Sequence, residues 1–155
     1  MVNEEISREP GSYIVILHSI TNETVNIGAR GPLQLMPGFY LYTGSALGPG
    51  GLRARLGHHL SVSQRPRWHI DYLRWVTEVW EAWLYIGDDR KEHHWANALA
   101  NTPGLAPVVP GFGASDCSCI THLFHTQSEP TIADFNRSLQ HLGLAANAFP
   151  LRKKM

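Results

Sequence analysis

Apolar residues along the chain follow two spacings, one typical of strands and the other of helices. Between residues 12 and 18 apolar side chains fall on both faces of an extended chain, with Ile14 and Ile16 on one and Tyr13 and Leu17 on the other. Successive side chains of a strand point to opposite faces, so this pattern predicts a strand buried on both sides near the centre of a sheet.

Further elements follow from the same spacings and from the turn and cap residues between them. Strands are predicted at residues 24–29, 33–36, 39–44, 79–86 and 119–126, and helices at 51–60, 68–75, from the Asp88-Asp89 cap to about 100, and at 131–142. Strands come first and helices alternate with them later, which predicts a mixed α/β (α+β) fold: a small central, mainly antiparallel sheet flanked by helices. Residues 1–10 and 150–155 are expected to be flexible ends.

Length and composition narrow the class of protein. At 155 residues the chain is expected to form one domain with its own core. No apolar run reaches membrane-spanning length, and the acidic start, residues 1–5, is unlike a signal peptide. Two cysteines without a secretory signal favour a reducing compartment, so we expect a cytoplasmic protein.

Charge is balanced over the whole chain but not locally. The formal net charge is zero, which argues against a strong, non-specific nucleic-acid binder. Between Gly51 and Val76 there are five arginines and one acid, Asp71, for a local net charge of +4 (five minus one). This stretch is either a solvated helical face or a patch that follows a nucleic-acid backbone.

Residues 38–60 are predicted to form a strand, a glycine-rich loop and a helix. Residues 44–51 contain four glycines and a proline, so we expect no regular structure there. In one interpretation Tyr42, Arg55 and His59 converge over this loop to hold a phosphate, a group that a guanidinium binds well. The alternative is an ordinary strand-to-helix connection with a core tyrosine and a solvated arginine.

Several motifs of this chain resemble those of a nuclease family. They are Gly11-Ser12-Tyr13, Tyr42-Thr43-Gly44, the pair Arg55 and His59, Trp68-His69-Ile70-Asp71-Tyr72-Leu73, and Gly111-Phe112-Gly113-Ala114-Ser115-Asp116-Cys117-Ser118-Cys119-Ile120-Thr121-His122-Leu123-Phe124. Their order and spacing resemble the GIY-YIG nuclease superfamily, and the two long signatures resemble its small stand-alone prokaryotic (Uri-type) branch. The likeness covers roughly residues 11 to 126. Ser12 stands where isoleucine is usual in the first motif.

The resemblance implies a metal-dependent endonuclease and assigns roles to residues of this chain. Its catalytic residues would be Tyr13, Tyr42, Arg55, His59 and Glu92, and its substrate-binding residues Gly44, Ser45, Arg53, Arg67 and His69. Arg55 would neutralise charge on the phosphoryl oxygens. The base that accepts a proton from the attacking water stays open among Tyr13, Tyr42 and His59, because a tyrosine needs a nearby cation to favour its phenolate. The alternative for Tyr13 is a core aromatic side chain.

Glu92 is the expected ligand of a single divalent metal ion. Trp95, Ala96 and Leu99, at plus three, four and seven, place its carboxylate on the inward face of the predicted helix. On the residues alone, Asp89 and Glu92 fit a capping box better. The resemblance favours the metal ligand, and a lone carboxylate suits Mg²⁺ or Mn²⁺.

Cys117, Cys119 and His122 have the composition of a zinc site but supply only three ligands, and a fourth could come from His69, Asp116 or His125. The alternative is two buried cysteines and a histidine that donates to a carbonyl group. The Trp68–Asp71 segment either orients substrate or simply starts a helix with its apolar residues in the core.

The leading hypothesis is therefore a nuclease that acts on DNA rather than RNA and has no membrane partner. The alternative is a non-catalytic nucleic-acid or protein binding module on the same fold. Two observations suggest this alternative: the net charge of the chain is neutral, and no segment looks like a fused DNA-recognition domain. A zinc-stabilised adaptor centred on Cys117, Cys119 and His122 is a third hypothesis.

Overall fold

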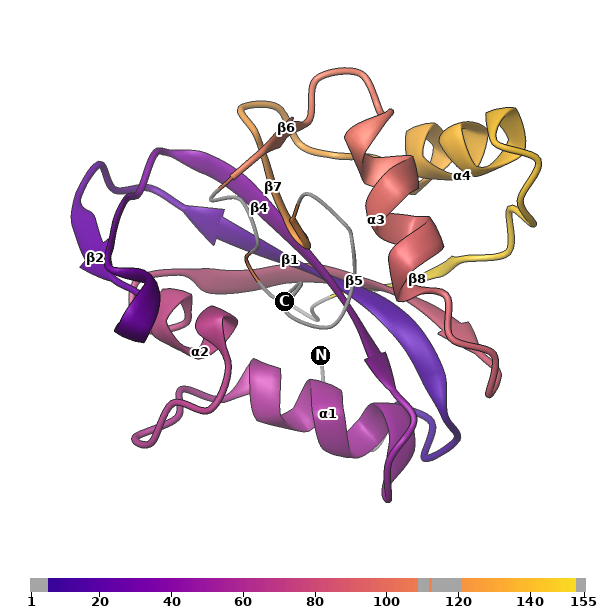
Figure 1. Ribbon diagram of the computed structural model, residues 1–155, viewed down its shortest axis with the longest axis horizontal. Coiled ribbons are helices and arrows are strands. Elements are labelled where there is room, and N and C mark those ends of the chain that lie inside the picture. The colour runs from indigo at the N-terminus through magenta and orange to yellow at the C-terminus, as the bar shows by residue number, and fades with distance from the viewer. Residues whose placement is uncertain (1–5, 109–111, 113–120, 153–155) are drawn as a thin grey trace.

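The structure is a computed structural model, and it describes residues 6–108, 112 and 121–152 of the chain. Its main sheet has the strand order β6-β7-β4-β1-β5-β8 (Figure 1). Every neighbouring pair is antiparallel, so the predicted mixed α/β fold around a mainly antiparallel sheet is confirmed. The strands are β1 (Gly11–Ser19), β4 (Gly38–Ala46), β5 (Glu78–Ile86), β6 (Ala106–Pro107), β7 (Leu123–Thr126) and β8 (Phe149–Arg152).

Helices cover both faces of this sheet (Figure 1). One face carries α1 (Gly51–Leu60) and α2 (His69–Leu73), and the other carries α3 (Glu92–Ala100) and α4 (Ile132–His141). Among the described residues, no helix combines the length and the apolar character needed to cross a membrane.

Strand β1 lies inside the sheet and is buried on both faces, as its apolar pattern predicts. Ile14 belongs to a core cluster with Trp95 of α3. Its neighbour Tyr13 belongs to a second cluster with Leu52 of α1 and Ile70 of α2. The sheet therefore separates two cores, and the phenol of Tyr13 lies on the side of α1.

A small second sheet pairs β2 (Thr24–Asn26) with β3 (Pro32–Gln34). The predicted strand at 24–29 ends early because the chain turns into the short 3₁₀ helix η2 (Gly28–Arg30). Gly28 has a φ of +50°, a conformation that costs glycine little.

Strand β4 continues to Ala46, so the prediction that residues 44–51 lack regular structure is wrong for 44–46, whereas residues 47–50 lie in neither a strand nor a helix. Gly44 pairs with Tyr13, and Ser45 with Ser12. A Cβ atom added at Gly44 would lie 2.5 Å from the hydroxyl oxygen of Tyr13. The glycine is needed because the tyrosine ring of the neighbouring strand covers it.

The described residues near both ends of the chain contact the rest of the domain. Ile6 is buried, and the carbonyl oxygens of Ser7 and Glu9 accept hydrogen bonds from the N–H groups of Arg53 (2.8 Å) and Leu52 (3.0 Å). At the other end, β8 pairs with β5. These contacts tie residues 6–9 to α1, and β8, which includes residues 150–152, to the sheet.

Helix α3 begins at Glu92, after Lys91 as its N-cap, and no side chain caps it. The capping box between Asp89 and Glu92 is therefore wrong. The carboxylate of Asp89 instead accepts a hydrogen bond from the hydroxyl of Tyr85 (2.7 Å) and lies 3.1 Å from Nζ of Lys91. This leaves the side chain of Glu92 available for other contacts.

Candidate functional site

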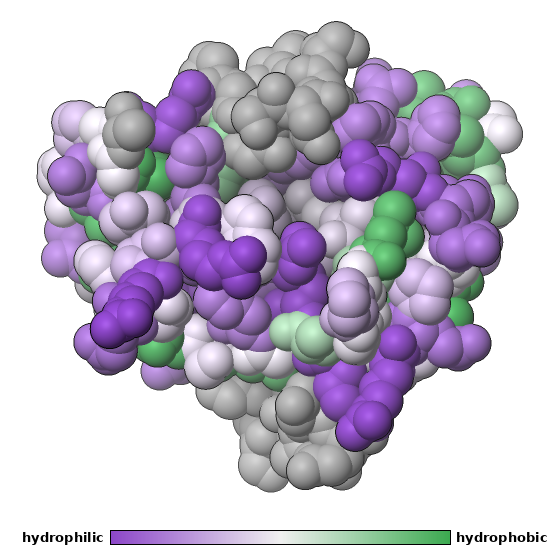
Figure 2. Space-filling view, turned by 60° about the horizontal axis from the view of Figure 1, so that its bottom comes forward, coloured by the Kyte–Doolittle hydropathy of each residue, from purple (hydrophilic) through white to green (hydrophobic). Residues whose placement is uncertain are grey.

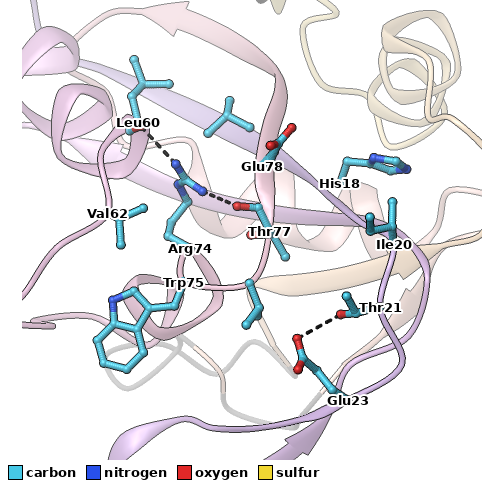
Figure 3. A pocket seen from close by; sticks show the side chains of 12 residues that line it. His18, Ile20, Thr21, Glu23, Leu60, Val62, Arg74, Trp75, Thr77 and Glu78 are labelled. Carbon is cyan, nitrogen blue, oxygen red and sulfur yellow. Dashed lines mark hydrogen bonds between the residues drawn. The ribbon is translucent and has the colours of Figure 1, made fainter.

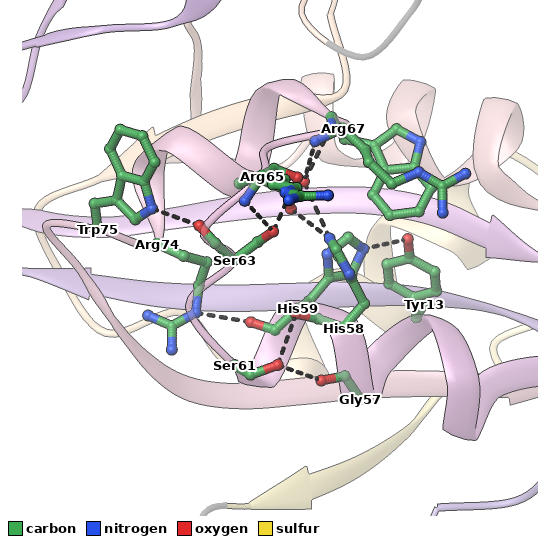
Figure 4. A network of polar contacts seen from close by, with 12 residues as sticks. Tyr13, Gly57, His58, His59, Ser61, Ser63, Arg65, Arg67, Arg74 and Trp75 are labelled. Atoms are coloured by element: carbon green, nitrogen blue, oxygen red, sulfur yellow. Dashed lines mark hydrogen bonds and ion pairs between the residues drawn. The ribbon is translucent and has the colours of Figure 1, made fainter.

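A buried hydrogen bond joins Tyr13 of β1 to His59 in the last turn of α1. The hydroxyl oxygen of Tyr13 lies 2.8 Å from Nε2 of His59 (Figure 4). Their exposed fractions are 0% and 1%. Burial lowers the pKa of His59 to about 3, so the imidazole is neutral near pH 7. Its tautomer decides whether Nε2 accepts the phenol proton or donates to the phenol oxygen.

Tyr42 and Arg55 complete a group around this pair. The Tyr42 ring, only 7% exposed, stands edge-on to the His59 ring at 5.9 Å between centroids. Burial raises the pKa of Tyr13 well above its ordinary value, and the charges of Tyr42 and Glu92 raise it further. The charge and a hydrogen bond of Arg55 lower that pKa. Tyr42, Arg55 and Glu92 therefore affect the ionisation of the Tyr13 phenol, and His59 forms a hydrogen bond with its hydroxyl group.

Arg55 also contacts the indole of Trp68. The guanidinium carbon of Arg55 lies 4.6 Å from the ring centroid, and that of Arg67 lies 4.8 Å from it. A guanidinium over an indole ring is held by cation–π attraction. Trp68 was expected only as a core residue, but it is half-buried and brings Arg55 and Arg67 together on the molecular surface.

Asp71 anchors the segment that presents Trp68. Its buried carboxylate accepts hydrogen bonds from the backbone N–H groups of Arg67 (2.7 Å) and Trp68 (3.0 Å), and Nε2 of His58 lies 3.0 Å from both oxygens. Burial acts to raise the pKa of Asp71, but these hydrogen bonds outweigh it and lower the pKa. The segment therefore starts helix α2, and it also holds Trp68 where its ring contacts Arg55 and Arg67.

The first turn of α1, which follows the glycine-rich loop, is closed by residues 7–9 of the chain itself. A free helix N-terminus attracts phosphate through its unpaired N–H groups, but those of Leu52 and Arg53 already bond the carbonyl oxygens of Ser7 and Glu9. A side chain at Gly51 would collide with the carbonyl oxygens of Arg8 and Glu9. The backbone N–H groups at this end of α1 are therefore occupied by the chain's own carbonyl groups, so a phosphate held by Arg55 would rely on side chains rather than on these groups.

The predicted substrate-binding residues do not form one surface. Gly44 lies beneath Tyr13, and Ser45 is 8% exposed. Nε of Arg53 donates to the carbonyl oxygen of Ile6 (2.8 Å), and the ring of His69 lies 5.0 Å from that of Phe112. Among these five predictions, Arg67 is the one that the structure brings beside Arg55, through Trp68.

Arg74 is not part of a surface patch. Its guanidinium is buried and donates to the carbonyl oxygens of His59 (2.7 Å), Leu60 (3.1 Å) and Thr77. These bonds satisfy the end of α1 and hold His59 in place (Figure 4). The local charge that faces solvent is therefore smaller than the sequence count suggests.

The face of the molecule shown in Figure 2 is largely hydrophilic, with scattered hydrophobic side chains.

Glu92 is the first residue of α3, a helix that covers the other face of the sheet from α1 (Figure 1), and its charge still raises the pKa of the Tyr13 phenol. Its side chain is 12% exposed; one oxygen lies 3.5 Å from Nε of Arg90, and the other lies 3.8 Å from Nδ1 of His122. Within the part of the chain that the structure describes, no group of three or more histidine, cysteine or acidic residues is arranged to hold a metal. Of the residues that the structure describes, Glu92 and His122 are those whose ligand atoms face each other here.

The zinc interpretation cannot be followed to its cysteines, because Cys117 and Cys119 lie outside the described residues. His122 is described and fully buried, and its carbonyl oxygen accepts a hydrogen bond from the N–H group of Thr43 (3.1 Å). Its imidazole faces Glu92, a pairing that sequence spacing did not signal.

A cavity of about 730 Å³ lies beside the C-terminal end of α1 and includes Leu60 in its lining (Figure 3). Val62, Trp75, Ile20 and Glu78 are among its lining residues, together with Arg74. None of the predicted site residues lines it. Its lining combines apolar side chains with polar ones such as His18, Glu23 and Glu78.

The fold and these contacts define a mixed α/β domain with a buried tyrosine–histidine pair beside an arginine. A family model described as domain of unknown function DUF123 matches residues 12–144, so the chain belongs to that family. No curated protein and no solved structure matches the chain. The matched range includes every residue of the candidate site.

Proposed function

We propose that this protein is a metal-dependent nuclease that hydrolyses phosphodiester bonds, with DNA as the favoured substrate. The observation that carries the proposal is the meeting of Tyr13, Tyr42, Arg55 and His59 around one hydroxyl group, within the electrostatic reach of Glu92. A guanidinium, a phenol and a carboxylate in one region are suited to phosphoryl chemistry, because that reaction depends on charge stabilisation and positioning.

Arg55 is the residue we assign to the phosphate. It is partly exposed, whereas Tyr13 and His59 are buried, so an incoming polyanion meets the guanidinium first. Trp68 limits its motion, which reduces the entropy lost when it binds a phosphoryl group. Arg67, held by the same indole, is available for a neighbouring phosphate.

The pKa values narrow the choice of proton acceptor. A histidine with a pKa of about 3 is a weak base near pH 7, so His59 is disfavoured as the direct acceptor. The phenols of Tyr13 and Tyr42 remain, and the raised pKa of Tyr13 means that added positive charge is needed to form its phenolate. Arg55 already supplies one such charge.

Glu92 is the residue that would hold the divalent ion, and its partly exposed carboxylate fits that role. A bound Mg²⁺ or Mn²⁺ supplies Lewis-acid polarisation of a phosphoryl oxygen. The remaining coordination positions would be left to water and substrate, as is usual for these ions.

The test is cleavage of end-labelled single-stranded DNA, duplex DNA and RNA by the full chain with Mg²⁺ or Mn²⁺, with a chelator as control. We expect Arg55→Ala and Glu92→Gln each to lower the rate by about 100-fold or more. Arg137→Ala, on the exposed face of α4, should cleave as the unmodified protein does. No cleavage of any substrate, or full cleavage by Glu92→Gln, would contradict the proposal.

A non-catalytic binding module on the same fold is the second candidate. Its specific support is the complete burial of Tyr13 and His59, since a reacting phenol must meet water or substrate. This function predicts binding of nucleic acid or protein without turnover and without any effect of a chelator. Binding measured by fluorescence anisotropy beside the cleavage assay separates the two.

A further inference from the structure

The clearest unexplained arrangement outside the tyrosine–histidine pair is the meeting of Glu92 with two histidines. Nδ1 of His122 faces the Glu92 carboxylate at 3.8 Å. His93, the next residue of α3, has its ring centroid 5.8 Å from that of His122. Nε2 of His93 is buried without a hydrogen-bond partner among the described residues. Leaving a buried polar atom unpaired is unfavourable, so this position favours a further polar group or water.

The spacing between Glu92 and His122 is unlike a simple hydrogen bond. An N–H···O bond closes to about 2.9 Å, and the observed distance of 3.8 Å is clearly longer. Two ligand atoms about 2.1 Å from one ion stand about 3.0 Å apart at a right angle and about 3.4 Å apart at the tetrahedral angle. The observed pair needs to close by only about 0.4 Å to share an ion in tetrahedral geometry.

We infer that Glu92 and His122 together form a mixed carboxylate–imidazole site for one divalent transition-metal ion. The inference deepens the proposed function and rests on it, since Glu92 is the residue assigned to the nuclease's ion. Water molecules and substrate oxygens complete the coordination, and His93 is placed to hydrogen-bond one of those waters. His122 is thus a ligand and His93 a positioning residue.

The chemical consequence is metal selectivity. Carboxylate and water suit Mg²⁺ and Mn²⁺, whereas an imidazole nitrogen favours first-row transition metals over Mg²⁺. The expected order of affinity is Mg²⁺ below Mn²⁺, and Mn²⁺ below Co²⁺ and Zn²⁺. Glu92 alone would give no such preference for nitrogen-seeking ions.

Pulsed electron paramagnetic resonance of the full chain loaded with Mn²⁺ tests this directly. A bound imidazole gives nitrogen-14 modulation of the manganese echo, and the modulation should change when the protein's histidines carry nitrogen-15. We expect His122→Asn to abolish the modulation and to weaken Mn²⁺ binding by about tenfold or more, as measured by titration calorimetry. His93→Asn is the matched control and should keep the modulation.

Each outcome decides the question. Mn²⁺ bound without nitrogen modulation in the unmodified protein overturns the inference, as does modulation lost in His93→Asn but kept in His122→Asn. If His122→Asn does not fold by circular dichroism, the nitrogen-15 comparison in the unmodified protein still decides whether a histidine binds the ion. If the protein cleaves nucleic acid but gives no nitrogen signal, the proposed function stands and the Glu92–His122 site is excluded. If the signal is present but no substrate is cleaved, the metal site stands and the nuclease function is excluded.

Discussion

His59 couples the folding of this protein to pH. Its pKa is about 3 in the folded state, below the ordinary value of 6.5, so the unfolded chain binds the proton more tightly. Its contribution to stability is therefore complete above about pH 6.5 and is lost as the pH falls toward 3. We expect the free energy of unfolding to drop by about 2 kcal/mol from this group between about pH 7 and pH 5, measured by urea denaturation.

A matched variant isolates this effect from other titrating groups. His59→Gln cannot titrate but keeps an amide that can bond the hydroxyl of Tyr13. The pH slope of the variant should be shallower by the amount assigned to His59, because the lowered pKa of His69 and all other groups are unchanged. Equal slopes in the two proteins would mean that His59 is not the responsible group.

Arg55→Lys tests whether shape as well as charge matters at this position. A lysine keeps the charge but lacks the planar fork that stacks on Trp68 and binds phosphate with two N–H groups. We expect the cleavage rate to fall by about 10- to 100-fold while the free energy of unfolding changes by less than about 1 kcal/mol. Arg137→Lys is the control, and an unchanged rate in Arg55→Lys would show that charge alone suffices.

At the scale of the element, the start of α2 depends on Asp71. Three donors meet its buried carboxylate: two backbone N–H groups and the ring of His58. Asp71→Ala should lower the free energy of unfolding by about 2–4 kcal/mol, because buried donors lose their partner. It should also weaken nucleic-acid binding, since Trp68 and Arg67 would no longer be held.

Asp134→Ala is the control for this element. Asp134 also lies in the first turn of a helix, but its carboxylate is 52% exposed and pairs with Arg137. A surface pair of this kind contributes about 0.5 kcal/mol or less. Similar losses in the two variants, measured by urea denaturation, would argue against a special role for Asp71.

The bounds of elements could be predicted where the signal was local. Leucines at helical spacing gave α1 as Gly51–Leu60, and the apolar pattern of β1 gave its two buried faces. The end of β4 could not be predicted, because Gly44 has the composition of a loop and its strand conformation comes from pairing with Tyr13. The strand β8 was missed because a basic C-terminal sequence carries no sign that β5 needs a partner.

Part of the candidate site could also be predicted from the sequence, and part could not. Tyr13, Tyr42, Arg55, His59 and Glu92 were named from motifs, and the structure brings them near one hydroxyl group. The contact between Glu92 and His122 joins residues from two distant segments, so no spacing rule could reveal it. Tyr13 is fully buried, which agrees with the alternative that the sequence offered for it, a core aromatic side chain.

At the scale of the whole molecule, the neutral net charge limits how nucleic acid can bind. With Arg74 buried, few arginines remain near the site, chiefly Arg55 and Arg67. Neutralising about two to three phosphates of a single strand gives a slope of log K against log salt of about −2. We expect this slope from anisotropy titrations in increasing NaCl, and Arg67→Ala should make it shallower by about 0.7.

Arg137→Ala should leave the salt slope unchanged, since that side chain pairs with Asp134 on another face. A slope steeper than about −5 would point to an extended basic surface elsewhere on the protein.

The docking of residues 7–9 onto the first turn of α1 has a practical consequence for handling this protein. A chain shortened to the family-matched range, which begins at residue 12, would lack the carbonyl groups that bond the first N–H groups of α1. This helix carries Arg55 and His59. A shortened recombinant version could then lose activity for a reason unrelated to chemistry. Purification tags are better attached ahead of residue 6, with the native lead-in left intact.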